Sequence, residues 1–211
     1  MRPVACMISP TFDAGSASIQ QWVSQAREAA RAGLELVQVR QPGLDGGELL
    51  TIVRECVQAV ASYTTRVIVN DRLDVALMAS AHGVHLRGDS FAARRARRLT
   101  PPGFLIGRSV HTAPEAREVT AAGGLDYLMF GTTFPTTSKP GRVAAGVEQL
   151  AAVAASVSLP VLAVGGITLD RIPAVAASGA AGVAAINMFA DTSVSDTAAQ
   201  LRRRWLNASN L

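Results

Sequence analysis

The sequence alternates short apolar runs with longer amphipathic segments, and it does so eight times. The runs are rich in β-branched and other apolar side chains, as expected for parallel strands that are covered on both faces. These expected strands span residues 4–8, 36–40, 67–70, 83–86, 105–109, 127–130, 161–164 and 183–187. The expected helices between them include residues 19–32, 47–62, 114–122, 146–155 and 170–178.

Eight strand–helix units predict an α/β fold, a single (β/α)8 TIM barrel that forms one domain over residues 1–211. The hydrophobic fraction of 49% against 17% charged residues excludes a disordered chain and indicates a well-filled core. A doubly wound sheet is the competing fold. That fold usually carries a glycine-rich loop after its first strand, whereas here Ser9, Pro10, Thr11 and Phe12 follow.

The sequence also indicates in which cellular compartment the protein is expected. No apolar run approaches the roughly 20 residues of a membrane span, and the apolar start is too short for a signal peptide. The two cysteines, Cys6 and Cys56, lack metal-site spacing, so we expect both to be buried and reduced in a cytoplasmic protein.

The net charge is +4, and much of the excess lies in the arginine clusters at residues 94–98 and 202–204. No aromatic residues are interleaved with these clusters and no nucleic-acid motif is present, so we predict solvated helix faces and no nucleic-acid partner. A mildly basic barrel would still attract small anionic phosphates.

Six of the eight expected strands end in polar residues or glycines. In a TIM barrel the carboxyl ends of the strands meet on one rim, where the ligands bind. The candidates on this rim are Gln38, Arg40, Asn70, Asp71, Ser109, His111, Thr132, Gly165, Gly166, Ile186 and Asn187.

These residue types suit the binding of an anion. Gly165 and Gly166 leave backbone N–H groups unobstructed, and Thr168 or Asp170 could cap the next helix, whose positive end favours phosphate. A buried Arg40 would need an anionic partner. The loop after the sixth strand adds hydroxyl groups and a cation, at Thr136, Thr137, Ser138 and Lys139.

Six motifs cover nearly the whole chain in order. They are Gln38-x-Arg40, Val69-Asn70-Asp71-Arg72-x-Asp74-Val75-Ala76, Gly83-Val84-His85-Leu86, Gly107-x-Ser109-x-His111-Thr112, Phe134-Pro135-Thr136-x-Ser138-Lys139 and Val164-Gly165-Gly166-Ile167. Together they resemble the thiamine phosphate synthase and TenI superfamily. The resemblance implies a barrel of thiamine biosynthesis that binds a thiazole phosphate.

Two chemistries occur in that superfamily. Synthases join the thiazole phosphate to hydroxymethylpyrimidine diphosphate and release diphosphate, with Mg²⁺ on the diphosphate. TenI-type members instead aromatise a thiazole tautomer by proton transfer and require no cofactor.

The resemblance also implies roles for individual residues. Gln38, Arg40, Asn70 and Ser109 would face the pyrimidine diphosphate. Asp71 would be a Mg²⁺ ligand in a synthase, and Lys139 would contact the diphosphate. The thiazole phosphate would be held by Thr136, Thr137, Ser138, Gly165 or Gly166, and the backbone of Ile186 and Asn187.

Several positions depart from the synthase pattern. Pro42 stands where synthases carry a lysine, and Ser90 stands where they carry a second metal aspartate, with Asp89 one place off. Loss of a cation and of a carboxylate would weaken the stabilisation of a departing diphosphate. Thr132 stands where TenI-type tautomerases carry their acid–base histidine, so neither chemistry is fully equipped.

Proton transfer needs a group that titrates near neutral pH, and the chain has three histidines. We expect His82 to be solvated and His85 to be a satisfied residue of the barrel wall. His111 could face the pocket and transfer a proton, or it could only shape the rim.

Three hypotheses follow. The favoured one is a TenI-like thiazole tautomerase, in which His111, Lys139 and Asp71 are the catalytic candidates. The second is a thiamine phosphate synthase that uses Mg²⁺. The third is a non-catalytic regulatory barrel that binds a phosphorylated ligand. We also expect a homo-oligomer with no membrane partner.

Overall fold

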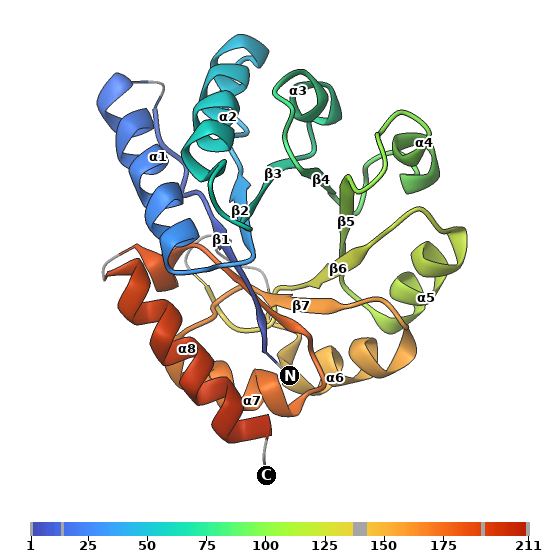
Figure 1. The fold of residues 1–211 in the computed structure, drawn as a ribbon. Coiled ribbons are helices and arrows are strands. Elements are labelled where there is room, and N and C mark those ends of the chain that lie inside the picture. Colours follow the sequence, from blue (N-terminus) through green and yellow to red (C-terminus); the bar gives the residue numbers. More distant parts are fainter. Residues whose placement is uncertain (1, 14, 137–142, 191–192, 210–211) are drawn as a thin grey trace.

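Eight parallel strands close into one barrel in chain order, surrounded by helices (Figure 1). This computed structural model describes residues 2–13, 15–136, 143–190 and 193–209. The strands are β1 (Val4–Ile8), β2 (Leu36–Val39), β3 (Arg66–Asn70), β4 (Gly83–Leu86), β5 (Leu105–Val110), β6 (Tyr127–Phe130), β7 (Val161–Val164) and β8 (Gly182–Ala185). The predicted (β/α)8 TIM barrel is therefore confirmed.

The helices follow their strands in sequence. They are α1 (Ser16–Arg31), α2 (Gly46–Val60), α3 (Leu73–Met78), α4 (Ala93–Arg97), α5 (Ala113–Ala122), α6 (Gly146–Ser156), α7 (Ile172–Ala177) and α8 (Val194–Ser209), with 3-10 turns η1 (Leu169–Arg171) and η2 (Asn187–Phe189). Asp45 starts α2 in a capping box with Glu48, in which each side chain satisfies a backbone N–H of the other residue. None of the helices in the described part of the chain combines the length and hydropathy needed to cross a membrane.

Several expected boundaries differ from the structure by a few residues, and two of these differences near the barrel rim affect the candidate site. The eighth strand ends at Ala185, so Ile186 and Asn187 lie beyond the sheet. The expected helix over residues 170–178 is divided into the 3-10 turn η1 and the short helix α7. Pro173 lies near the start of α7, where its missing N–H leaves no helical hydrogen bond unmade.

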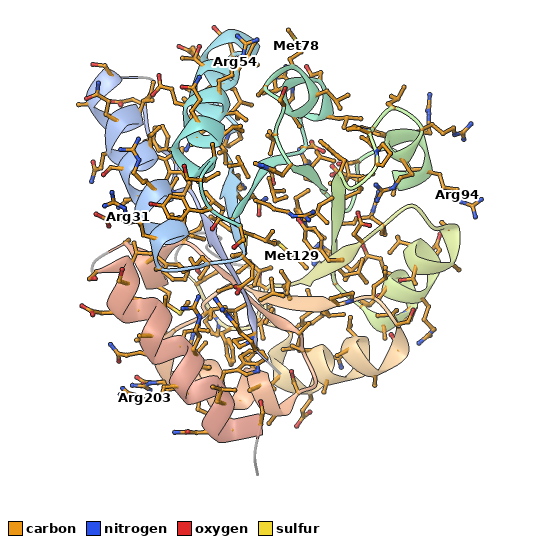
Figure 2. The ribbon with its side chains drawn as sticks, viewed as in Figure 1. Arg31, Arg54, Met78, Arg94, Met129 and Arg203 are labelled. Atoms are coloured by element: carbon orange, nitrogen blue, oxygen red, sulfur yellow. The ribbon has the colours of Figure 1, made fainter. Side chains whose placement is uncertain are left out.

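The core has two layers because side chains of a strand alternate between the barrel interior and the helices. The interior cluster consists of Cys6, Ile8, Leu36, Ile68, Tyr127, Met129, Leu162 and Ala184. Figure 2 shows Met129 at the centre of the barrel. A larger apolar cluster lies between the sheet and the helices.

Both cysteines are free and buried, as predicted. Burial raises the pKa of the Cys56 thiol to about 12 and also raises the pKa of Cys6. Both thiols are therefore protonated near neutral pH, and the thiolate is the reactive form of cysteine.

The arginine clusters are only partly the solvated faces that the sequence predicted. Arg94 and Arg203 are exposed and point away from the barrel (Figure 2). Arg97, however, donates to the carbonyl oxygen of Phe104 and pairs with Asp126 at 2.5 Å. Arg202 donates to the carbonyl oxygens of residues 32 and 33, and so ties α8 to the end of α1.

Gly107 on β5 leaves space for the ring of Tyr127 inside the barrel. A Cβ atom at position 107 would lie 2.1 Å from Cζ of Tyr127. The Tyr127 ring also stacks on His85, with 5.7 Å between ring centroids. The barrel interior therefore depends on the absence of a side chain at this strand position.

We predict that Gly107→Ala destabilises the protein by about 1–3 kcal/mol, because the new methyl group overlaps the tyrosine ring. Urea denaturation measures the change. Gly43→Ala is the matched control, because nothing lies within 4 Å of a Cβ atom placed there. Equal stability of the two variants would contradict this account of the packing.

Candidate active site

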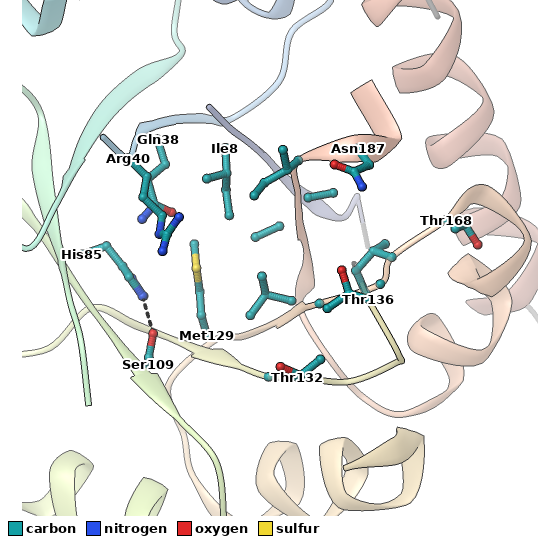
Figure 3. A pocket seen from close by; sticks show the side chains of 18 of the residues that line it. Ile8, Gln38, Arg40, His85, Ser109, Met129, Thr132, Thr136, Thr168 and Asn187 are labelled. Atoms are coloured by element: carbon teal, nitrogen blue, oxygen red, sulfur yellow. Dashed lines mark hydrogen bonds between the residues drawn. The ribbon is translucent and has the colours of Figure 1, made fainter. Parts of the chain in front are cut away.

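A cavity of about 300 Å³ opens at the carboxyl ends of the strands (Figure 3). We call it the inner cavity. It is lined by many of the residues that the sequence singled out: Gln38, Arg40, Asn70, Ser109, His111, Thr132, Thr136, Gly165, Gly166, Ile186 and Asn187. Thr137, Ser138 and Lys139 lie outside the described residues. The functional roles of the lining residues remain predictions.

The inner cavity is electropositive. Among the described residues that line it, Arg40 and Arg171 carry permanent positive charges, and no aspartate or glutamate lines it. Sequence reasoning did not identify Arg171, because it lies in the helix expected over residues 170–178. Its only sequence signal is its place, five residues after Gly166.

The Gly165–Gly166 turn lines the inner cavity and also packs closely against the segment after β6. Both glycines have positive φ, 97° and 63°. A Cβ atom at Gly166 would lie 2.4 Å from the carbonyl oxygen of Pro135. The backbone N–H of Phe134 also donates to the Gly165 carbonyl at 3.0 Å. The segments after β6 and β7 are therefore held directly against each other.

Two side-chain hydrogen bonds form the opposite wall of the inner cavity. Gln38 donates from Nε2 to Oδ1 of Asn70 at 3.2 Å. Nε2 of His85 contacts Oγ of Ser109 at 2.9 Å (Figure 3). Gln38 is 1% exposed, and its Oε1 has no hydrogen-bond partner among the described residues. A buried acceptor of this kind suits a donor group of a bound ligand.

The histidines differ partly from expectation. His85 is a buried barrel residue as predicted, but it also lines the inner cavity. His82 is half-buried rather than simply solvated, because its Nδ1 accepts from the backbone N–H of Val67 at 3.0 Å. Burial, followed by the charge of Arg66, lowers the pKa of His82.

His111 lies where the inner cavity meets a second cavity. Its Nδ1 contacts the carbonyl oxygen of Gly131, and its backbone N–H donates to Glu115 at 2.7 Å. A carbonyl oxygen only accepts, so Nδ1 carries a hydrogen, and in the neutral ring the lone pair is on Nε2. The contact with Gly131 orients the His111 ring, and the bond to Glu115 holds its backbone.

The second cavity, which we call the outer cavity, has a volume of about 770 Å³. It shares four wall residues with the inner cavity: Arg40, Asn70, Ser109 and His111. It has mixed charge, and its ionisable side chains besides Arg40 and His111 are Asp71, Arg72, Arg87, Asp89 and Glu115.

Asp71 directly follows β3 and is held in place by a backbone hydrogen bond and by neighbouring side chains. Its φ is 61°, and its N–H donates to the carbonyl oxygen of His85 at 2.9 Å. The Ser90 hydroxyl donates to its carboxylate. Arg87 lies 3.8 Å from the same carboxylate.

Asp89, one place from the position at which the synthase pattern expects a second carboxylate, pairs with an arginine rather than contacting Asp71. Its carboxylate pairs with Arg87 at 2.6 Å and is 71% exposed, whereas Ser90 is the residue that contacts Asp71. Among the described residues, no group of three or more histidine, cysteine or acidic side chains is arranged to hold a metal ion.

Arg108 holds the loop that carries Arg87, Asp89 and Ser90. It is 8% exposed on the helix-facing side of β5. It donates to three carbonyl oxygens, those of Gly88 at 2.6 Å, Ser90 at 2.8 Å and Phe91 at 3.0 Å. Sequence reasoning gave it no such role, although a charged residue inside an apolar strand was a signal.

Comparison with known proteins identifies what the chain is similar to. The family described as thiamine monophosphate synthase matches residues 7–189. A thiamine-phosphate synthase of Methanoculleus marisnigri is 41% identical over 184 residues, which is 85% of each chain. One from Anaeromyxobacter dehalogenans is 42% identical over 168 residues, 78% of this chain and 73% of that protein.

Solved structures agree with these relatives. A thiamine phosphate pyrophosphorylase from Pyrococcus furiosus superposes with a TM-score of 0.81 at 30% identity, over 97% of this chain and 96% of that one. A 3-hexulose-6-phosphate synthase superposes with a TM-score of 0.72 at 19% identity, over 96% and 99% of the two chains. At that lower identity the likeness concerns the fold alone.

We predict that Arg108→Met loosens the loop over residues 87–91, because three carbonyl oxygens lose a charged donor that is worth about 1.5–3 kcal/mol per bond. Faster amide exchange in this loop, measured by mass spectrometry, and a loss of at least about 2 kcal/mol in urea are expected. Arg95→Met, at an exposed position on α4, is the control. Unchanged exchange in the loop would contradict the role given to Arg108.

Proposed function

This chain belongs to the thiamine monophosphate synthase family, and from that premise we propose that it is a thiamine phosphate synthase. The reaction joins hydroxymethylpyrimidine diphosphate to thiazole phosphate. The bond between the methylene carbon and the diphosphate oxygen breaks, and its electron pair leaves with diphosphate. A new bond forms between that carbon and the thiazole nitrogen, which gives thiamine phosphate.

The observation that carries the proposal is the pair of cavities with a common wall. Arg40, Asn70, Ser109 and His111 line both cavities. A reaction between two substrates needs both to be held side by side where the bond forms, and two cavities with a common wall can hold them in that way. A unimolecular proton transfer within one thiazole needs only the inner cavity.

The inner cavity suits the thiazole phosphate. Its described lining carries two arginines and no carboxylate, and apolar side chains such as Ile8 and Met129 lie between its polar walls (Figure 3). A heterocycle would contact the apolar part, while the phosphate would lie against the exposed backbone of the Gly165–Gly166 turn.

The outer cavity suits the diphosphate with Mg²⁺. The carboxylate of Asp71 lines this cavity and accepts a hydrogen bond from the Ser90 hydroxyl, and such oxygens are of the hard type that Mg²⁺ prefers. Mg²⁺ in proteins is often held by one or two carboxylates together with substrate phosphates. Asp71 would hold the ion. When bound, Mg²⁺ supplies positive charge that stabilises the departing diphosphate.

Arg87 adds a cation to the cavity that Pro42 also lines. The lysine that the synthase pattern expects at position 42 is absent, and the guanidinium comes instead from the segment after β4. Arg40 at the common wall adds a second cation. Together these two arginines would stabilise negative charge on the diphosphate.

The sequence favoured a thiazole tautomerase, and we now prefer its alternative, a thiamine phosphate synthase. The curated relatives are named thiamine-phosphate synthases. The position of the tautomerase histidine is occupied by Thr132, which is buried in the wall of the inner cavity and has no group that titrates near neutral pH. A non-catalytic barrel remains an outcome of the assay below.

We predict that the purified protein forms thiamine phosphate and diphosphate from the two substrates with Mg²⁺. Asp71→Asn should lower kcat/KM at least 100-fold, because the carboxylate that would bind the ion is lost. Asp196→Asn, on the exposed start of α8, should change kcat/KM less than threefold. No product from the wild-type protein would refute the synthase. Aromatisation of the carboxylated thiazole tautomer would then distinguish a tautomerase from a barrel that only binds.

We also predict that Ser90→Asp strengthens Mg²⁺ binding at least tenfold in calorimetry with inorganic diphosphate, because it places a second carboxylate beside Asp71. Without Mg²⁺ the same variant should have a lower Tm than the wild type, since two like charges repel. Ser90→Asn, which adds similar bulk without charge, should not strengthen Mg²⁺ binding. Equal Mg²⁺ affinity of the Ser90→Asp variant and the wild type would contradict this placement of the metal.

A further inference from the structure

Arg171 lines the inner cavity beside the Gly165–Gly166 turn. Its Nη1 donates to the carbonyl oxygen of Gly166 at 2.5 Å, and its Cζ lies 4.7 Å from the centroid of the Phe134 ring. The first contact ties the guanidinium to the segment after β7, and the second ties it to the segment after β6. The group is therefore fixed between the two segments expected to hold a phosphate.

Among the described residues, a side chain supplies the positive charge at this end of the cavity. The sequence instead predicted that the positive end of a helix would attract the phosphate there. The turn η1 is three residues long and ends at Arg171. The Thr168 side chain makes no capping bond, and Asp170 accepts from Arg204 on α8 instead of capping the helix. A short 3-10 turn has little dipole, so the guanidinium is the stronger source of positive charge here.

The two arginines of the inner cavity occupy different places. Arg40 belongs to the common wall and lines both cavities, whereas Arg171 lines the inner cavity alone. In Figure 3, Arg40 lies near Gln38 and His85, while Thr136, Thr168 and Asn187 lie across the cavity. None of these three residues lines the outer cavity, and the same holds for Gly166, which Arg171 contacts.

We propose that Arg171 binds the phosphate group of the thiazole substrate and so selects the phosphorylated thiazole over the free thiazole alcohol. This inference rests on the proposed function for the identity of the substrate, and its chemistry is the recognition of a phosphate monoester. A guanidinium has five N–H donors in a planar fork, and the bond to Gly166 uses one of them. The remaining donors can bind phosphate oxygens in the bidentate manner that lysine cannot reproduce.

The test compares three ligands by calorimetry on the wild type and on Arg171→Gln: thiazole phosphate, the free thiazole alcohol and inorganic phosphate. The Kd for thiazole phosphate should rise at least 30-fold in the variant, and the Kd for the alcohol should change less than threefold. Binding of inorganic phosphate should weaken in the same direction as binding of the ester. Arg171→Lys should give an intermediate loss, because it keeps the charge without the fork.

Arg203→Gln is the matched control, since it removes an exposed arginine of α8 that does not line either cavity. Its affinity for all three ligands should equal that of the wild type. In the coupled reaction, Arg171→Gln should raise the KM for thiazole phosphate and leave the KM for the pyrimidine diphosphate unchanged.

Three results would overturn the inference: an unchanged Kd for thiazole phosphate in Arg171→Gln, equal weakening of ester and alcohol, or no binding of the ester to the wild type. A different result would show that the proposed function is wrong. In that case the wild type would form no thiamine phosphate, while the preference for the ester would still depend on Arg171.

Discussion

The pairing of the first strand with the last is the constraint on which the site depends. β1 lies parallel to β8, with Val4 opposite Gly182 and Met7 opposite Ala185. This contact admits only glycine at position 182, because a Cβ atom there would lie 2.0 Å from the carbonyl oxygen of Val4. Closure brings the carboxyl ends of all eight strands to one rim, so Gln38 on β2 and the turn after β7 face the same cavity although they lie far apart in the sequence.

The charged side chains at the rim of the closed barrel are divided between the two cavities. The described lining of the inner cavity is free of carboxylates, whereas the outer cavity combines Asp71 and Asp89 with Arg87. In the proposed reaction, this division would separate the phosphate monoester from the diphosphate with its Mg²⁺. The loop that carries Arg87 and Ser90 is held from behind by Arg108, whose guanidinium donates to three of its carbonyl oxygens. A buried cation that satisfies backbone acceptors supports the outer cavity without lining it.

The structure shows which groups lie near the two positions that depart from the synthase pattern, Pro42 and Ser90. Pro42 removes a cation from the segment after β2, but Arg87 from the segment after β4 lines the same cavity. Ser90 removes a carboxylate, and its hydroxyl donates to Asp71 instead. The sequence shows only that a lysine is missing at position 42, whereas the folded chain brings a cation to the same cavity from the segment after β4, two strands away.

The alternation of apolar runs was enough to predict the barrel, because each parallel strand must be covered on both faces and each run has the length of one strand. The rim residues were predicted for the same reason, since strand order fixes which ends meet. Arg171 and Arg108 could not be assigned in this way. One lay in an expected helix that became a 3-10 turn, and the other faced the helices rather than the cavity. Sequence by itself determined the fold and many of the residues that line the cavities at the rim, because both follow from local periodicity. Only the tertiary structure decided how the rim divides into two cavities and where each guanidinium lies, because those depend on contacts between distant segments.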